Sequence, residues 1–219
     1  MSAAFAGTRS STRVLVLVGV VWFALAYIAA AVGLVDRPAT EPPLRIALAA
    51  GIPVLAVAVG LLTSRRLRWF AATLDLPLLI NLQALRAAGF AFLVLYAADL
   101  LPGGFAFPAG LGDLAVALTA PFVARYVVRR TRAAWPVFLG WTLFGIADFI
   151  MAVALGAIHD LGAQRTAADA TIITPPMAEL PLSLIPTFAV PFLLVVHLLA
   201  IARFRADEMT QDPSLNTST

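Results

Sequence analysis

Six long apolar stretches fill most of this chain of 219 residues, and they constrain its fold more than any other feature. A helix needs roughly 20 apolar residues to cross a bilayer, so six such helices and their connections occupy nearly the whole sequence. Only 12% of the residues are charged, whereas soluble domains carry about 25%. We therefore expect an all-α bundle of six transmembrane helices and no soluble domain.

The expected domain organisation is a short N-terminus at 1–13, a single six-helix domain at 14–202 and a polar tail at 203–219. Residues 64–77 are expected to form a short interfacial segment. The first apolar stretch is longer than the 7–15 residues of a cleaved signal peptide, which favours an uncleaved helix. The spans are expected at about 14–35, 44–63 and 78–101, then a fourth that ends near 124, and finally 135–158 and 181–202.

The arginines lie mainly on one side of these spans. All 15 basic residues are arginine, and eleven of them flank the spans on the side that holds both termini. Positively charged residues stay in the cytoplasm during insertion, so both termini are expected to be cytoplasmic. The use of arginine in place of lysine, together with the many alanines, favours a GC-rich bacterial genome. The expected location is therefore a cell membrane, the inner membrane of a bacterium.

Composition also excludes several kinds of chemistry. The chain has no cysteine, no lysine and two histidines. These absences remove thiolate nucleophiles and iron–sulfur clusters, lysine Schiff bases, and three-histidine zinc sites. We expect no metal and no cofactor. The basic excess is explained by topology, so nucleic acid is not an expected partner. The expected partners are the lipid bilayer, a small solute, proton or lipid ligand, and a membrane protein or a second copy of the chain.

Ionisable residues inside a membrane span are costly, which makes them candidates for a functional site. Arg86 lies about eight residues into the third span and shares a helix face with Gln83. Asp148 lies about 13 residues into the fifth span, on a stripe of small residues that indicates a packed interface. Their estimated depths differ by about 7 Å. We therefore expect Arg86 and Asp148 to interact, either as a structural ion pair or as part of a functional site.

Asp113 has two possible positions. If the fourth span begins near Phe107, Asp113 lies inside the membrane, and if it begins at Leu114, Asp113 is the N-cap of the helix. In the sixth span, Glu179, Ser183, Thr187 and His197 form a polar stripe by helical spacing. His197 can be either a satisfied core residue or a group on an ion pathway. The candidate pathway residues are Gln83, Arg86, Asp113, Asp148, Glu179 and His197.

These residues favour a transporter, or a proton- or ion-coupled carrier, with a buried polar site. One alternative is a non-catalytic membrane subunit of a larger complex. Another is a membrane enzyme that acts on a lipid or isoprenoid, with Arg86 holding an anionic headgroup. The longest connection, from His159 to Leu180, is expected to fold over the outer mouth of the bundle because Ile172, Ile173 and Met177 are apolar.

Overall fold

The computed structural model describes residues 2–35, 44–131, 133–165, 177 and 179–211. Within these residues, six helices are long and apolar enough to cross a membrane. The described chain is helical, so the expected all-α bundle is confirmed. The helices in chain order are α1 (Ser2–Ala31), α2 (Leu44–Thr63), α3 (Arg65–Ala72), α4 (Leu76–Leu82), the 3₁₀ helix η1 (Gln83–Gly89), α5 (Phe90–Ala97), α6 (Gly103–Val128), α7 (Ala134–Arg165), the π-helix η2 (Ile185–Ala189) and α9 (Val190–Gln211).

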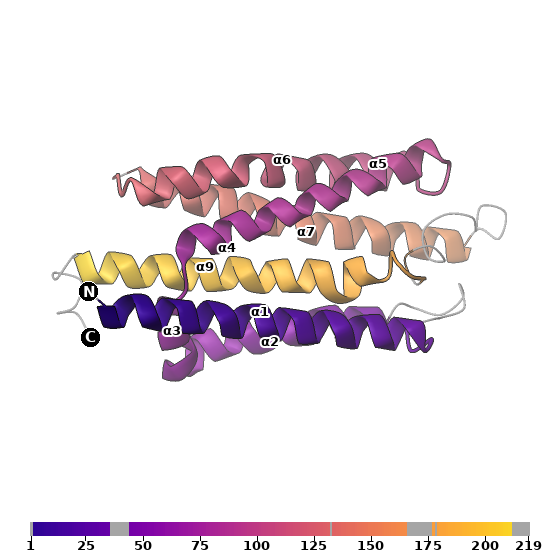
Figure 1. Ribbon diagram of the computed structural model, residues 1–219. Helices are drawn as coiled ribbons and strands as arrows, with labels where there is room; N and C mark the ends of the chain where they lie inside the picture. Colours follow the sequence, from indigo (N-terminus) through magenta and orange to yellow (C-terminus); the bar gives the residue numbers. More distant parts are fainter. Residues whose placement is uncertain (1, 36–43, 132, 166–176, 178, 212–219) are drawn as a thin grey trace.

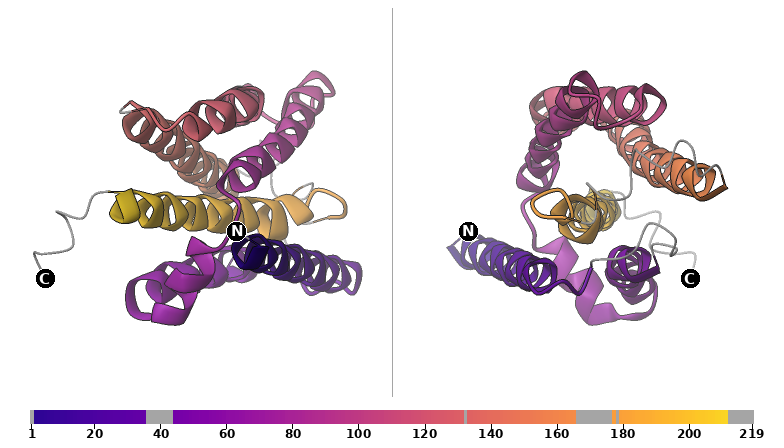
Figure 2. Two further views of the ribbon diagram at one scale, coloured as in Figure 1. Left: turned by 60° about the vertical axis from the view of Figure 1, so that its left-hand side comes forward. Right: turned by 90° about the vertical axis from the view of Figure 1, so that its right-hand side faces the viewer.

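Helix α9 lies at the centre of the bundle. It packs against α2 and α3 on one side and against α4 and α7 on the other. In Figure 1 it runs between the pair α1 and α2 below and the group α4 to α7 above, and Figure 2 shows it in the middle when the bundle is viewed from its end. Helix α1 meets the rest of the bundle at η2, where Trp22 and Phe23 make edge contacts with the ring of Phe188.

The third span is not a continuous α-helix. Asp75 caps its start by accepting a hydrogen bond from the Leu78 backbone nitrogen at 2.8 Å, and Pro77 stands in the first turn, where its missing N–H costs nothing. The span then tightens into η1 between α4 and α5. A 3₁₀ stretch within a helix often marks a hinge, and η1 carries both Gln83 and Arg86.

Helix α6 decides between the two positions expected for Asp113. The helix begins at Gly103, with Pro102 as its N-cap residue, so Asp113 lies ten residues inside it. The alternative in which Asp113 is the N-cap of this helix is therefore wrong. The Gly/Pro-rich stretch 102–108 forms the start of this helix: Pro102 is the N-cap residue, and Pro108 lies inside the helix, where it lacks a backbone donor.

The sixth span also has an irregular start. Pro186 lies inside η2 and Pro191 near the beginning of α9, where each lacks a backbone donor. The Thr187 hydroxyl and the Thr187 backbone nitrogen both donate to the Ser183 carbonyl, at 2.6 Å and 3.2 Å. Helix α9 then continues to Gln211, beyond the expected end at residue 202.

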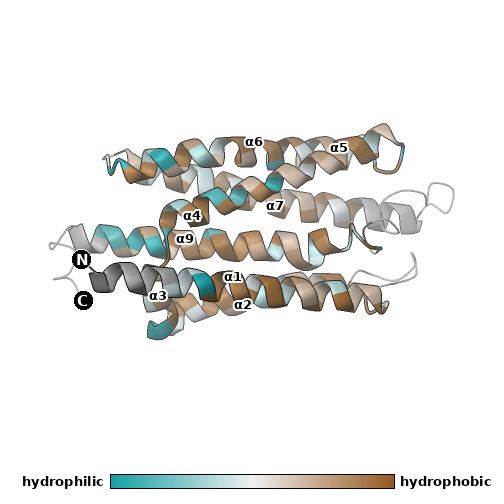
Figure 3. Ribbon diagram, in the orientation of Figure 1, coloured by the Kyte–Doolittle hydropathy of each residue, from teal (hydrophilic) through white to brown (hydrophobic). Residues whose placement is uncertain are grey.

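One end of the bundle is polar and the middle is apolar. Figure 3 shows brown over most of the long helices, with teal at the end that holds α3 and the last turns of α9. Arg203 fastens this end, donating from Nε to the Leu74 carbonyl at 2.7 Å and pairing with Asp207. The start of α1 lies at the same end (Figure 1). The expected lid at 159–180 falls largely outside the described residues.

Candidate functional site

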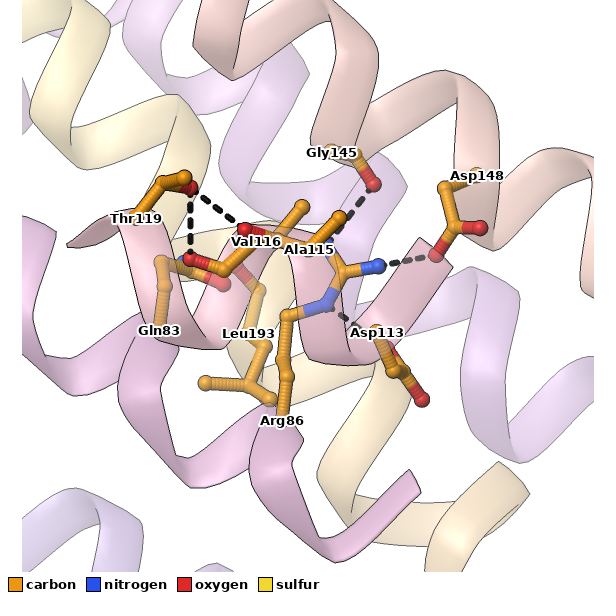
Figure 4. A network of polar contacts seen from close by, with 9 residues as sticks. All are labelled: Gln83, Arg86, Asp113, Ala115, Val116, Thr119, Gly145, Asp148 and Leu193. Atoms are coloured by element: carbon orange, nitrogen blue, oxygen red, sulfur yellow. Dashed lines mark hydrogen bonds and ion pairs between the residues drawn. The ribbon is translucent and has the colours of Figure 1, made fainter. Parts of the chain in front are cut away.

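Arg86 lies at the centre of the polar contacts inside the bundle. Its Nε donates to Asp113 Oδ1 of α6 at 2.7 Å, and its Nη1 donates to the Gly145 carbonyl of α7 at 2.9 Å. Its Nη2 forms an ion pair with Asp148 Oδ2, which also comes from α7. Figure 4 shows the guanidinium between these three partners. We call Arg86, Asp113 and Asp148 the Arg86 cluster. The contact expected between Arg86 and Asp148 is present, and Asp113 adds a second carboxylate to it.

The cluster is enclosed by protein. The Arg86 side chain has no exposed surface, while the side chains of Asp148 and Asp113 are 2% and 12% exposed. The guanidinium carbon lies 3.7 Å from the centre of the Phe149 ring, a cation–π contact from the residue that follows Asp148. Arg86 therefore has carboxylates at its edges and an aromatic ring against its face.

Three glycines provide the space that the cluster occupies. A Cβ on Gly112 would overlap the Asp148 carboxylate, and a Cβ on Gly89 would overlap the Asp113 side chain. A Cβ on Gly145 would lie 3.1 Å from Arg86 Nη1 and 2.7 Å from His197 Nε2. The absence of side chains at these positions allows η1, α6 and α7 to approach closely enough to bury the cluster.

His197 reaches the cluster from α9. It is 1% exposed, and its ring contacts the edge of Trp141 with 5.6 Å between the ring centres. Its Nε2 faces Gly145 beside Arg86 Nη1 and has no hydrogen-bond partner among the described residues. The Trp141 Nε1 donates to Thr119 Oγ1 of α6 at 2.9 Å, which holds this wall of the site in place.

Gln83 ties the third span to α9. Its Nε2 donates to the Leu193 carbonyl at 3.0 Å, and the residue is 1% exposed. Leu193 is one helical turn before His197. Gln83 and Arg86 thus share the buried face expected from their spacing, and that face meets α9 as well as α6 and α7.

The structure does not bring every candidate together. Glu179 is exposed and precedes η2, and within the described part of the chain no hydrogen bond or ion pair joins its side chain to the Arg86 cluster. Ser183 and Thr187 are buried at the start of the sixth span. Phe149, Gly89 and Gly112 were not among the site residues expected from the sequence. The one signal available in advance was that Gly112 and Phe149 are immediate neighbours of the two aspartates.

The cluster carries unequal charge. One guanidinium meets two carboxylates, so the fully ionised cluster has a formal charge of −1. Asp148 Oδ1 is buried without a hydrogen-bond partner in the described part of the chain, where it lies against Gly112. Charge buried in this way is costly, and one proton would neutralise the cluster. Among the described residues, no group of three potential metal ligands comes together.

A family model supplies the comparison with known proteins. The domain of unknown function DUF8737 matches residues 43–205, which is most of the chain. The chain belongs to this family. The DUF8737 region extends from the start of α2 into α9, so it contains the whole Arg86 cluster, Gln83 and His197. No curated protein and no solved structure matches the chain.

Proposed function

We propose that this protein is a small proton-coupled carrier, with the Arg86 cluster as its proton-binding site. The observation that carries the proposal is the buried contact of one guanidinium with two carboxylates inside the membrane-spanning bundle. Ionisable residues at such depth are typical of proton relays and substrate pathways. The proposed setting is the inner membrane of a bacterium, with both termini in the cytoplasm.

The charge of the cluster supports proton binding. With both aspartates ionised, a net negative charge stays in a low-dielectric interior, which is unfavourable. With one aspartate protonated, the cluster is neutral and Arg86 still has one charged partner. The two forms differ by a single proton. A carrier can therefore use this change to favour one conformation over another.

The helices around the cluster support movement. Arg86 itself lies in the 3₁₀ helix η1, and α9 follows the π-helix η2. Interruptions of this kind are frequent at hinges and functional sites.

The alternatives are less well supported. An enzyme that uses Arg86 to hold an anionic headgroup requires guanidinium donors that the headgroup can reach, but the Arg86 side chain has no exposed surface and is already paired with Asp113 and Asp148. A subunit of a larger complex has one observation in its favour. None of the 20 residues of α2, all of which the structure describes, is fully buried, so the face of α2 that is turned away from α9 is open to lipid or to a partner helix.

The first experiment measures proton binding. Infrared difference spectra of the protein in liposomes are recorded between neutral and acidic pH, and a carbonyl band from a protonated buried carboxyl group is expected. Asp148→Asn should remove or displace this band. Asp99→Asn is the matched control, because Asp99 is exposed and its left-handed backbone suits asparagine.

The second experiment measures coupling. Liposomes that contain a pH-sensitive dye are exposed to small solutes one at a time, and a solute that drives proton entry in the wild type should fail to do so in Asp148→Asn. If the infrared band is absent from the wild type, or is unchanged in both Asp148→Asn and Asp113→Asn, the cluster does not bind the proton and the proposal fails. If a complex with another membrane protein purifies and no solute moves protons, the subunit alternative is correct.

A further inference from the structure

Arg86 Nη1 and His197 Nε2 converge on one point of α7. Both atoms lie within 3.1 Å of the place where a Cβ would stand on Gly145, one at 3.1 Å and the other at 2.7 Å. Nη1 donates one of its hydrogens to the Gly145 carbonyl and retains a second. A donor and an acceptor from two different helices are thus held side by side at a glycine.

The Nε2 atom of His197 accepts a hydrogen bond in the neutral tautomer that carries its hydrogen on Nδ1, and a guanidinium donor beside Nε2 favours that tautomer. The residue is 1% exposed, and this atom has no hydrogen-bond partner within the described ranges. Leaving a buried acceptor unpaired is unfavourable, so a conformation in which the acceptor is paired gains the free energy of that hydrogen bond. Asp148 Oδ1, on the other side of the guanidinium, is unpaired in the same way among the described residues.

Other charged groups are not placed to compete for His197. Arg86 is the charged group that acts on the imidazole from the elements around it. Asp148 on α7 pairs with Nη2 of the same guanidinium. Apart from Arg86 and Asp148, the charged residues on the elements that pack against α9 lie near helix ends: Arg45 on α2, Arg65, Arg66 and Arg68 on α3, Asp75 before α4, Asp160 and Arg165 on α7, and Arg203, Arg205, Asp207 and Glu208 on α9 itself.

We propose that His197 is a positioning residue that serves as an alternative hydrogen-bond acceptor for Arg86 when Asp148 is protonated. This inference rests on the proposed function, because the proton on Asp148 starts the exchange. It adds the step by which proton binding between η1, α6 and α7 reaches the central helix α9.

In this exchange of hydrogen-bond partners, one proton enters the cluster and no other atom or charge is gained or lost. The Asp148 carboxylate takes up one proton and becomes a neutral carboxyl group, which no longer attracts the guanidinium as an ion. The Nη2 contact with Asp148 is released, and Nη1 donates its second hydrogen to His197 Nε2. Arg86 stays cationic and keeps Asp113 as its charged partner, while the imidazole stays neutral throughout.

The effect on α9 follows from the contacts of η1. Gln83, one turn before Arg86, already donates to the Leu193 carbonyl of α9. A second hydrogen bond from Arg86 to His197 would fasten η1 to α9 at two points one turn apart and weaken its attachment to α7. Protonation would thereby change which helices move together, which a coupled carrier requires.

The experiment follows the nitrogen of His197 directly. The chain has two histidines, so protein with isotope-labelled histidine nitrogens in lipid nanodiscs, with His159→Gln as background, shows one imidazole by NMR. On acidification the unprotonated Nε2 resonance is expected to move upfield, as it does when such a nitrogen accepts a hydrogen bond. In Asp148→Asn the shifted position is expected at neutral pH, because the asparagine mimics the neutral carboxyl group.

Two variants serve as controls. Asp99→Asn should leave the resonance at its wild-type position, and Arg86→Gln should abolish the shift at every pH. If Asp148→Asn does not fold, the wild-type titration alone tests the exchange. A resonance that stays fixed while the infrared band shows carboxyl protonation overturns the exchange but leaves the proposed function intact. Protonation of both ring nitrogens also overturns it, because His197 would then carry the proton itself. Absence of the carboxyl band, with no shift in Asp148→Asn, overturns both proposals.

Discussion

At the scale of single residues, Arg86 determines whether two buried carboxylates are tolerated. Replacing it with methionine, which is similar in length and apolar, would leave Asp113 and Asp148 without a counterion. We expect Arg86→Met to destabilise the protein by about 3–5 kcal/mol, the usual cost of breaking a buried ion pair from one side. Reversible unfolding in mixed detergent micelles measures this loss.

The same unfolding measurement distinguishes the contributions of the two carboxylates to stability. Arg86→Met with Asp148→Asn should recover only part of the stability, because Asp113 remains charged, and adding Asp113→Asn should recover most of the rest. The sequence predicted a contact between Arg86 and Asp148 alone, in which each charge balances the other. Full recovery in that double variant would show that Asp113 contributes nothing to the cluster.

Glycine substitutions test the packing around the cluster. An added Cβ at Gly112 would overlap the Asp148 carboxylate, so Gly112→Ala should destabilise by about 1–3 kcal/mol, as overpacking does in other cores. Gly51→Ala is the control, because a Cβ there meets nothing within 4 Å. That control should be neutral or stabilising by up to about 1 kcal/mol, since alanine favours a helix. Equal effects at the two positions would contradict the close approach at Gly112.

At the scale of helices, hydropathy predicts where a segment crosses the membrane but not how regular it is. The second span was expected at 44–63 and the structure has α2 at Leu44–Thr63. The expected interfacial segment corresponds to α3. The 3₁₀ helix η1 was not expected, because tertiary contacts such as that of Gly89 with Asp113 leave the mean hydropathy unchanged. The irregular start of the sixth span, at η2, agrees with the interruption that Pro186 and Pro191 predict.

The residues of the candidate site could be predicted from the sequence in part, as the helices could. Burial of charge singled out Arg86, Asp148 and His197 from the sequence alone, since each interrupts an apolar run. Asp113 stayed ambiguous because an aspartate near a helix start fits both a cap and a core position. The pairing of Nη1 with the Gly145 carbonyl could not be predicted, because it depends on the rotation of α7 against η1.

The contact between η1 and α9 can be tested with a matched pair of variants. Gln83→Leu removes the hydrogen bond to the Leu193 carbonyl and should destabilise by about 1 kcal/mol, the net value of one such bond. Asn81→Leu is the control, because Asn81 is exposed and bonds only to the Pro77 carbonyl of its own helix. The free energy of unfolding of both variants is measured in detergent micelles. A loss of stability in Gln83→Leu no greater than that in Asn81→Leu would mean that the contact does not hold η1 on α9.

At the scale of the whole molecule, a polar centre is surrounded by apolar helices whose outer faces are exposed. Arg86, Asp148, Gln83 and His197 are all at most 4% exposed, whereas α2 buries no residue at all. This distribution is the reverse of that in a soluble protein, because lipid replaces water around the bundle. The costly polar groups are therefore kept away from the lipid by the helices around them.

The orientation of the bundle is the last prediction, and the absence of cysteine makes it simple to test. Single cysteines are introduced as Arg66→Cys on α3 and Asp99→Cys after α5; both positions are exposed, and they lie near opposite ends of the third span. The positive-inside rule places the arginine-rich end in the cytoplasm. A membrane-impermeant maleimide should therefore label Asp99→Cys in intact cells and Arg66→Cys only after the membrane is opened. Labelling of Arg66→Cys in intact cells would invert the topology.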